Sequence, residues 1–271
     1  MTTAAESRIT QLQTFAKIGY LARGIVYMLL GYFALTTANS SGTTGVLDQI
    51  KDMPLGTVLL VLVGVGLAGY GVFRLYGAMI GIEPDAQSTK GKAKRVGHAA
   101  SGLAHLFLGY YALSEALGGG SSTSGGGSTE GQAASTLASM PGGTVLLAAV
   151  GICFLLAALS QGKKAFTGDF MRLLDPDAPT RAKYIGQAGY AARAVIFAVL
   201  GWTIVSKALS ENASEVGGIG QVLNNLRDTG WLYIAVALGL IMFGVFSLVM
   251  ARYRTIHDED VVERLKAEVR A

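Results

Sequence analysis

The stretch GYLARGIVY (19–27) returns later in the chain as GYAARAVIF (189–197). In both copies an arginine, Arg23 or Arg193, lies among side chains that are otherwise apolar. A looser copy lies between them in VGHAASGLAHLFLGYYAL, from Val96, which aligns with IGYLARGIVYMLLGYFAL. The recurrence indicates an internal repeat, and it raises the question of why each copy places an arginine among apolar side chains.

The composition favours a membrane protein. The chain has 271 residues, of which 51% are hydrophobic and 15% charged, whereas soluble domains carry about 25% charged residues. Nearly uncharged apolar runs of 18 or more residues can cross a bilayer, and they must do so as helices. We expect six such spans, at about 18–38, 54–80, 96–114, 142–160, 185–206 and 230–250.

The distribution of positive charge predicts the orientation. With the N-terminus inside, sixteen of the 22 lysines and arginines fall in cytoplasmic segments. Three (Lys51, Lys207 and Arg227) fall outside. The positive-inside rule therefore predicts a multi-pass plasma-membrane protein with both termini cytoplasmic. The sequence pI near 9.1 follows from this topology, so we expect no nucleic-acid partner.

The second helix of each repeat also recurs. MPLGTVLL (from Met53) returns as MPGGTVLL (from Met140), and GVFRLYGA (from Gly71) is similar to GVFSLVMA (from Gly244). Three repeats with two spans each all point the same way, so they are related by an axis along the membrane normal. The predicted fold is an all-α pseudo-threefold bundle of six transmembrane helices.

The predicted organisation has five parts. They are a cytoplasmic N-terminal segment (1–15), repeat 1 (16–82), repeat 2 (94–165, with a Gly/Ser-rich external loop at 118–131), repeat 3 (183–254) and a cytoplasmic C-terminal helix (255–271).

These motifs carry a family resemblance. Three tandem two-helix repeats, G-Y-x-A-R-[GA] near the start of the odd helices, and a closing SLVMARYRTI (247–256) resemble the bacterial membrane family called domain of unknown function 1206. The resemblance covers nearly the whole chain. It implies the repeat topology and no activity or site.

Enzymatic chemistry is not expected. GVGLAG (64–69) matches a dinucleotide-binding pattern but lies inside a predicted membrane helix, where it favours close helix packing. The HExxH, CxxC and GxSxG motifs do not occur. The lone Cys153 is most simply a small apolar side chain. We therefore predict no catalytic residue, no metal site and no cofactor.

The candidate binding residues lie on the first helix of each repeat. At three equivalent positions, spaced i, i+3 and i+7, they share one face of each helix. With Arg74 from a second helix, the predicted set is Tyr20, Arg23 and Tyr27; His98, Ser101 and His105; and Tyr190 and Arg193. The middle repeat has serine in place of arginine, and histidines whose charge can depend on pH.

The charge balance points to an anionic guest. Apart from Glu115 at the outer lip, the spans contain no aspartate or glutamate. This disfavours proton- or sodium-coupled transport, and guanidinium groups suit phosphate or carboxylate. For Arg23 and Arg193 themselves a packing role is favoured over an anion or lipid site, because they lie only roughly 9–14 Å from the cytoplasmic helix start and can reach headgroups or carbonyls of a neighbouring helix. For His98 and His105, structural hydrogen bonds are favoured over ligand binding.

Two functions follow from this prediction. The first is passage of a small anionic or neutral solute along the repeat axis. The second is a non-catalytic scaffold or accessory protein that binds membrane lipids through the same arginines. A water-accessible axis would favour passage, and a ring sealed by side chains would favour the scaffold. Oligomeric state and protein partners are left open.

Overall fold

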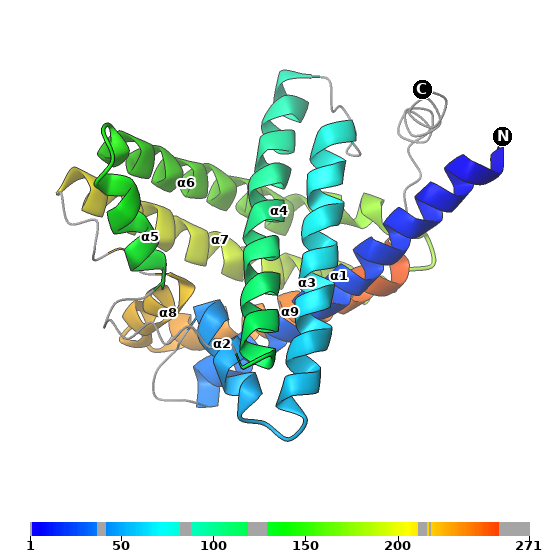
Figure 1. The fold of residues 1–271 in the computed structure, drawn as a ribbon, viewed down its shortest axis with the longest axis horizontal. Coiled ribbons are helices and arrows are strands. Elements are labelled where there is room, and N and C mark those ends of the chain that lie inside the picture. The colour runs from blue at the N-terminus through cyan, green and yellow to red at the C-terminus, as the bar shows by residue number, and fades with distance from the viewer. Residues whose placement is uncertain are drawn as a thin grey trace.

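The chain forms helices joined by short connections in a computed structural model (Figure 1). The structure describes residues 2–36, 42–81, 88–118, 129–210, 216 and 218–254, with the backbone alone for 2–13, 42–44, 90 and 129–133. The helices are α1 (Thr2–Thr36), α2 (Gly42–Lys51), α3 (Gly56–Ile80), α4 (Thr89–Ala116), α5 (Thr129–Ala138), α6 (Gly143–Thr167), the 3-10 helix η1 (Asp169–Leu173), α7 (Arg181–Leu209), α8 (Ile219–Arg227) and α9 (Trp231–Tyr253). The described residues contain no β-strand.

Five of these helices are long and apolar enough to cross a membrane: α1 from Thr14, α3, α6, α7 and α9. The exception among the six predicted spans is α4, which is 28 residues long. Its first turns carry lysines and an arginine, and its predicted site residues are polar, which lowers its hydropathy. The sixth span therefore stays a prediction. Residues 2–15 of the predicted N-terminal segment belong to α1, and the predicted tail helix 255–271 lies outside the described residues.

The helices pack most closely between repeats. The three tightest pairs are α3 with α4, α6 with α7, and α9 with α1 (Figure 1). Within repeats 1 and 3 the two helices also contact each other, α1 with α3 and α7 with α9. Within repeat 2, the described helices α4 and α6 show no comparable packing. The three pairs run in different directions in Figure 1, so the pseudo-threefold arrangement stays a prediction.

Small residues permit the close pairs between repeats. A Cβ added at Gly109 of α4 would lie 2.9 Å from the carbonyl oxygen of Gly64 in α3. The equivalent atom at Gly201 of α7 would lie 2.8 Å from the carbonyl oxygen of Gly151 in α6. Glycine is needed at these positions because the two backbones touch.

The contact between the two long helices of one repeat is close in repeats 1 and 3 but not in repeat 2. A Cβ at Gly19 would lie 2.2 Å from the Cβ of Tyr70, and one at Gly189 would lie 2.6 Å from the Cα of Phe243. Gly97, the equivalent position in α4, has no described heavy atom within 4 Å of such a Cβ. Repeat 2 is therefore open where repeats 1 and 3 are closed.

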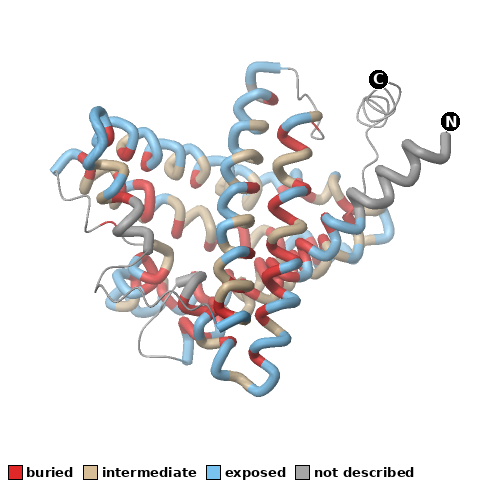
Figure 2. Tube along the Cα trace, in the orientation of Figure 1, coloured by how far each residue is buried: buried red, intermediate tan, exposed pale blue. Residues whose placement is uncertain are grey.

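Short amphipathic helices cover one end of the molecule. In α2 the side chains of Val46, Leu47 and Ile50 are buried, and in α8 those of Leu223 and Leu226 are buried. They join the larger of two apolar cores. The smaller core is rich in aromatic residues and contains Tyr20 and Tyr190 of the predicted site, with Tyr27 packed against it. Figure 2 shows buried residues concentrated where the helix pairs meet, whereas much of α4 and α6 is exposed.

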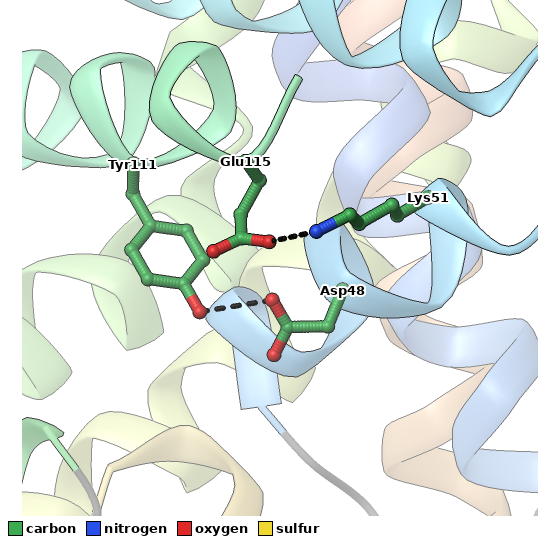
Figure 3. A network of polar contacts seen from close by, with 4 residues as sticks. All are labelled: Asp48, Lys51, Tyr111 and Glu115. Atoms are coloured by element: carbon green, nitrogen blue, oxygen red, sulfur yellow. Dashed lines mark hydrogen bonds and ion pairs between the residues drawn. The ribbon is translucent and has the colours of Figure 1, made fainter. Parts of the chain in front are cut away.

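Polar contacts hold α2 against the end of α4 (Figure 3). Tyr111 donates a hydrogen bond to Oδ1 of Asp48 over 2.9 Å, and Lys51 Nζ lies 2.9 Å from Oε2 of the buried Glu115. Partial burial raises the pKa of the Asp48 carboxyl. The hydrogen bond to Glu115 raises the pKa of Lys51. Glu115, predicted at the outer lip, therefore has its counter-charge in α2.

The glycine contacts predict opposite outcomes for two equivalent substitutions. Gly19→Ala should destabilise the protein by about 1–3 kcal/mol, because its Cβ meets α3. Gly97→Ala should be neutral or stabilising by up to about 1 kcal/mol, because alanine favours helix. Thermal unfolding in one detergent measures both. Equal losses would show that α4 is as closely packed as α1.

The ion pair at the end of α4 predicts a second contrast. Lys51→Met should lower the unfolding temperature, because it leaves the Glu115 carboxylate buried without its cation. Lys51→Met combined with Glu115→Gln should recover most of the loss. If the single variant unfolds at the wild-type temperature, the pair does not hold α2 in place.

Candidate anion-binding site

Arg23 lies at the centre of the aromatic core and is 8% exposed. Its Nη1 donates to the Tyr70 hydroxyl over 2.8 Å, and its Nε and Nη2 donate to the Ser247 hydroxyl over 3.3 and 3.2 Å. The Ser247 hydroxyl donates its own hydrogen to the Phe243 carbonyl over 2.9 Å. All the acceptors of Arg23 in these bonds are neutral, so they satisfy its donors without balancing its charge.

Aromatic rings surround the same guanidinium. Its Cζ lies 4.8 Å from the ring centre of Tyr20, 5.2 Å from that of Tyr70 and 4.9 Å from that of Phe243. Ring faces attract cations, and more strongly where water is excluded. Arg23 thus joins α1, α3 and α9, and we assign it the packing role that the sequence left open.

Arg193, on α7, contacts the same aromatic core through the ring of Phe243. Its Cζ lies 4.5 Å from the ring centre of Phe243, 4.8 Å from that of Phe197 and 5.5 Å from that of Tyr27. The ring of Phe243 therefore contacts two guanidinium groups, those of Arg23 and Arg193. The Nε of Arg193 is buried and has no hydrogen-bond partner among the described residues.

Arg74, on α3, completes a set of three arginines. Its Cζ lies 5.7 Å from the ring centre of Tyr70, which also contacts Arg23. Its Nε is likewise buried with no hydrogen-bond partner in the described part of the chain. Arg74 and Arg193 are half-buried, in contrast to Arg23.

The repeat alignment explains the arginine that is absent from repeat 2. In the second helices, Arg74 aligns with Gln161 and with Ser247. At these aligned positions each closely packed helix pair has one arginine: Arg23 with Ser247 in α1–α9, Arg193 with Gln161 in α6–α7, and Arg74 with Ser101 in α3–α4. Arg23 and Ser247 are hydrogen-bonded. In the α1–α9 and α6–α7 pairs the arginine lies on the first helix of a repeat, but in the α3–α4 pair it lies on α3, the second helix of repeat 1, and the serine lies on α4. Gln161 Oε1 is also buried without a hydrogen-bond partner among the described residues.

The histidines of α4 have different surroundings. Nδ1 of His105 lies 2.7 Å from the carbonyl oxygen of Ser101, and since a carbonyl only accepts, Nδ1 carries the hydrogen. The His105 ring packs edge-on against Tyr70, with the centres 4.7 Å apart. His98 is half-buried. In the described residues, no group of three or more His, Cys, Asp and Glu side chains could hold a metal ion.

The structure brings most of the predicted site residues together. Tyr20 and Tyr190 are buried, and Tyr27 and Tyr190 both pack on Phe243, with ring centres 4.9 and 5.4 Å away. His98 and Ser101 remain half-exposed on α4. The sequence analysis missed Tyr70, Phe243, Ser247 and Gln161. Alignment of the second helices was the signal that could have found them.

Chemically, the cluster is cationic and its neighbours are neutral. Guanidinium groups with open Nε–H donors, in an aromatic and partly desolvated setting, suit an oxyanion. The arrangement offers neither a nucleophile paired with a base nor paired carboxylates among the described residues of the cluster.

Comparisons with known proteins give a family without an assigned activity. The family model described as Domain of Unknown Function (DUF1206) matches residues 18–81, 96–168 and 188–254. Uncharacterized protein YxxB of Bacillus subtilis (strain 168) is 29% identical over 255 residues, which cover 90% of this chain and 91% of that protein. No solved structure matches.

The hydrogen bonds of Arg23 predict a large effect of a small substitution. Ser247→Ala should lower the free energy of unfolding by about 2 kcal/mol, because it removes the acceptor of two charged donors. Ser160→Ala, at an exposed serine of α6, is the matched control and should change little. Chemical denaturation of both variants measures the difference. A neutral Ser247→Ala would show that Arg23 does not depend on this contact.

Proposed function

Because the chain belongs to the DUF1206 family, whose description names no activity, we propose its function from geometry: it binds an oxyanion at Arg74 and Arg193 within the membrane. The anion is a phosphate or carboxylate, carried by a lipid headgroup or by a small solute. The protein acts as a binding component and performs no chemistry on its ligand.

One observation carries the proposal. Three guanidinium groups gather on one aromatic core in spans whose sequence lacks aspartate and glutamate. Uncompensated charge inside a membrane is costly, and such residues usually serve a function. Arg23 has protein partners for its donors, but the buried Nε groups of Arg74 and Arg193 do not, within the described residues. An oxyanion would supply both the missing charge and the missing acceptors.

Binding is better supported than passage. Tyr20, Tyr70 and Phe243 are buried around Arg23, and Tyr190 is buried against Phe243, so side chains fill the part of the cluster through which a solute would have to pass. This packing favours the scaffold or lipid-binding role over the transport role. We place the site in the cytoplasmic half of the plasma membrane, because the positive charge distribution favours cytoplasmic termini.

The proposal predicts a specific loss of anion binding. Arg74→Gln with Arg193→Gln should weaken binding at least about tenfold, since a hydrogen bond to a charged group contributes about 1.5–3 kcal/mol. Arg172→Gln, at an exposed arginine of η1, should bind like wild type. The measurement is the rise in unfolding temperature of detergent-solubilised protein with inorganic phosphate or with short-chain phosphatidylglycerol.

The two probes separate the two sources of the anion. Stabilisation by phosphatidylglycerol alone identifies a lipid headgroup, and stabilisation by phosphate as well identifies a free solute. Phosphate efflux from liposomes containing the protein would then favour passage. If the double variant responds to both probes as wild type does, the arginines serve packing and the proposal is wrong.

A further inference from the structure

Repeat 2 lacks a contact that repeats 1 and 3 both make. In repeat 1, α1 packs on α3, and in repeat 3, α7 packs on α9, but α4 and α6 show no comparable packing within the described residues. We call the faces of α4 and α6 that would meet by repeat equivalence the seam, defined by Gly97 and Ala100 on α4 and by Cys153, Ala157 and Ser160 on α6.

Contacts at equivalent residues show that the seam face of α6 is uncovered. In repeat 1, a Cβ at Gly66 would lie 2.5 Å from the Cβ of Ala22, and in repeat 3, one at Gly239 would lie 2.5 Å from that of Ala192. The equivalent of both glycines in repeat 2 is Cys153, which is exposed. Position 153 thus carries a larger side chain and no neighbouring helix that covers it.

Repeat 2 has also lost the side chains that fill this contact elsewhere. Tyr70 and Phe243 align with Ala157, and Phe73 and Phe246 align with Ser160. All four aromatic side chains are buried, whereas Ser160 is exposed. The seam is therefore lined by small side chains where the other repeats have aromatic ones.

The arginines differ in exposure according to whether their helix pair flanks the seam. Arg74 belongs to the α3–α4 pair and Arg193 to the α6–α7 pair, which are the two walls of the seam. Both arginines are half-buried, and each has a buried, unpartnered Nε among the described residues. Arg23 belongs to the α1–α9 pair, away from the seam, and it is buried with its donors satisfied.

From this arrangement we propose that the seam holds a phospholipid, with one acyl chain between α4 and α6 and its phosphate directed toward Arg74 and Arg193. The inference rests on the proposed function and names the ligand class of that site. A phospholipid fits because it combines a negative headgroup for the cationic walls with a slender apolar chain for the small side chains of the seam.

Charge complementarity selects the lipid over a second copy of the chain. The six spans of another copy would bring the same arginines, and their sequence contains no carboxylate to neutralise them. A phosphate supplies that negative charge. The apolar side chains exposed on the same two helices, such as Leu103 and Leu156, suit a lipid environment beside the bound chain.

Refilling the seam tests the proposal. Ala157→Phe with Ser160→Phe restores the aromatic pair of repeats 1 and 3, so it should keep the fold and displace the lipid. Ile152→Phe with Leu159→Phe adds aromatic rings at two exposed positions of the same helix, seven residues apart on a face that the seam does not include, and is the matched control. Each protein is equilibrated in nanodiscs of phosphatidylglycerol and phosphatidylcholine, released into mild detergent and examined by native mass spectrometry.

The proposal expects wild type and the control to retain one phospholipid, and the refilled variant to retain it at least tenfold less while unfolding at the same or a higher temperature. Wild type without retained lipid, or a refilled variant that retains lipid like wild type, would overturn it. Lipid loss in the refilled variant but not in Arg74→Gln with Arg193→Gln would support the seam and refute the proposed anion site. Lipid loss in Arg74→Gln with Arg193→Gln but not in the refilled variant would support the anion site and refute the seam.

A cross-link distinguishes the other occupants. Ala100→Cys places a thiol opposite the native Cys153, at positions equivalent to the touching Ala22 and Gly66. We expect little disulfide in lipid-loaded protein. Rapid disulfide formation within one chain would show that α4 and α6 close on each other, and formation between chains would show a second copy. Either result would overturn the proposal.

Discussion

The structure depends on how a guanidinium group is accommodated without a carboxylate inside a bundle of long apolar helices. Arg23 is held by two neutral hydroxyl groups and three aromatic rings, which together join α1, α3 and α9. Tyr70 reaches this position because Gly19 allows α3 to approach the backbone of α1. The close contact between α1 and α3 and the burial of the Arg23 guanidinium therefore depend on each other. Without the glycine, α3 cannot bring the Tyr70 hydroxyl to Arg23, and without the hydroxyl groups the donors of the buried Arg23 are unsatisfied.

Repeat 2 departs from this arrangement in several coordinated ways. It has Ser101 at the position of Arg23 and Arg193, it has Ala157 and Ser160 at the aromatic positions, and within the described residues its two helices show no close packing on each other. Arg74 supplies the third guanidinium from the neighbouring repeat. The result is an asymmetric set of arginines: Arg23 is buried with its donors satisfied, whereas Arg74 and Arg193 are half-buried on the two helix pairs that flank repeat 2. The proposed lipid site rests on this asymmetry.

The sequence predicted the apolar helices well, because hydrophobic length is a local property that each segment carries by itself. The cluster of Arg23, Arg193 and their tyrosines followed from helical spacing and repeat alignment. The pairing of helices between repeats did not follow, because it depends on which small residues face each other, as Gly151 and Gly201 do. The helices α2, α5 and α8 escaped notice because they span 10, 10 and 9 residues, too short to stand out beside the apolar runs.

The most direct measurement is cryo-electron microscopy of the protein in a phospholipid bilayer, with the density between α4 and α6 resolved. The account predicts a phosphate within roughly 2.7–2.9 Å of guanidinium nitrogens from both Arg74 and Arg193, as charge-assisted hydrogen bonds require. An empty space there, with both guanidinium groups bonded only to protein or turned into bulk headgroups, would contradict it.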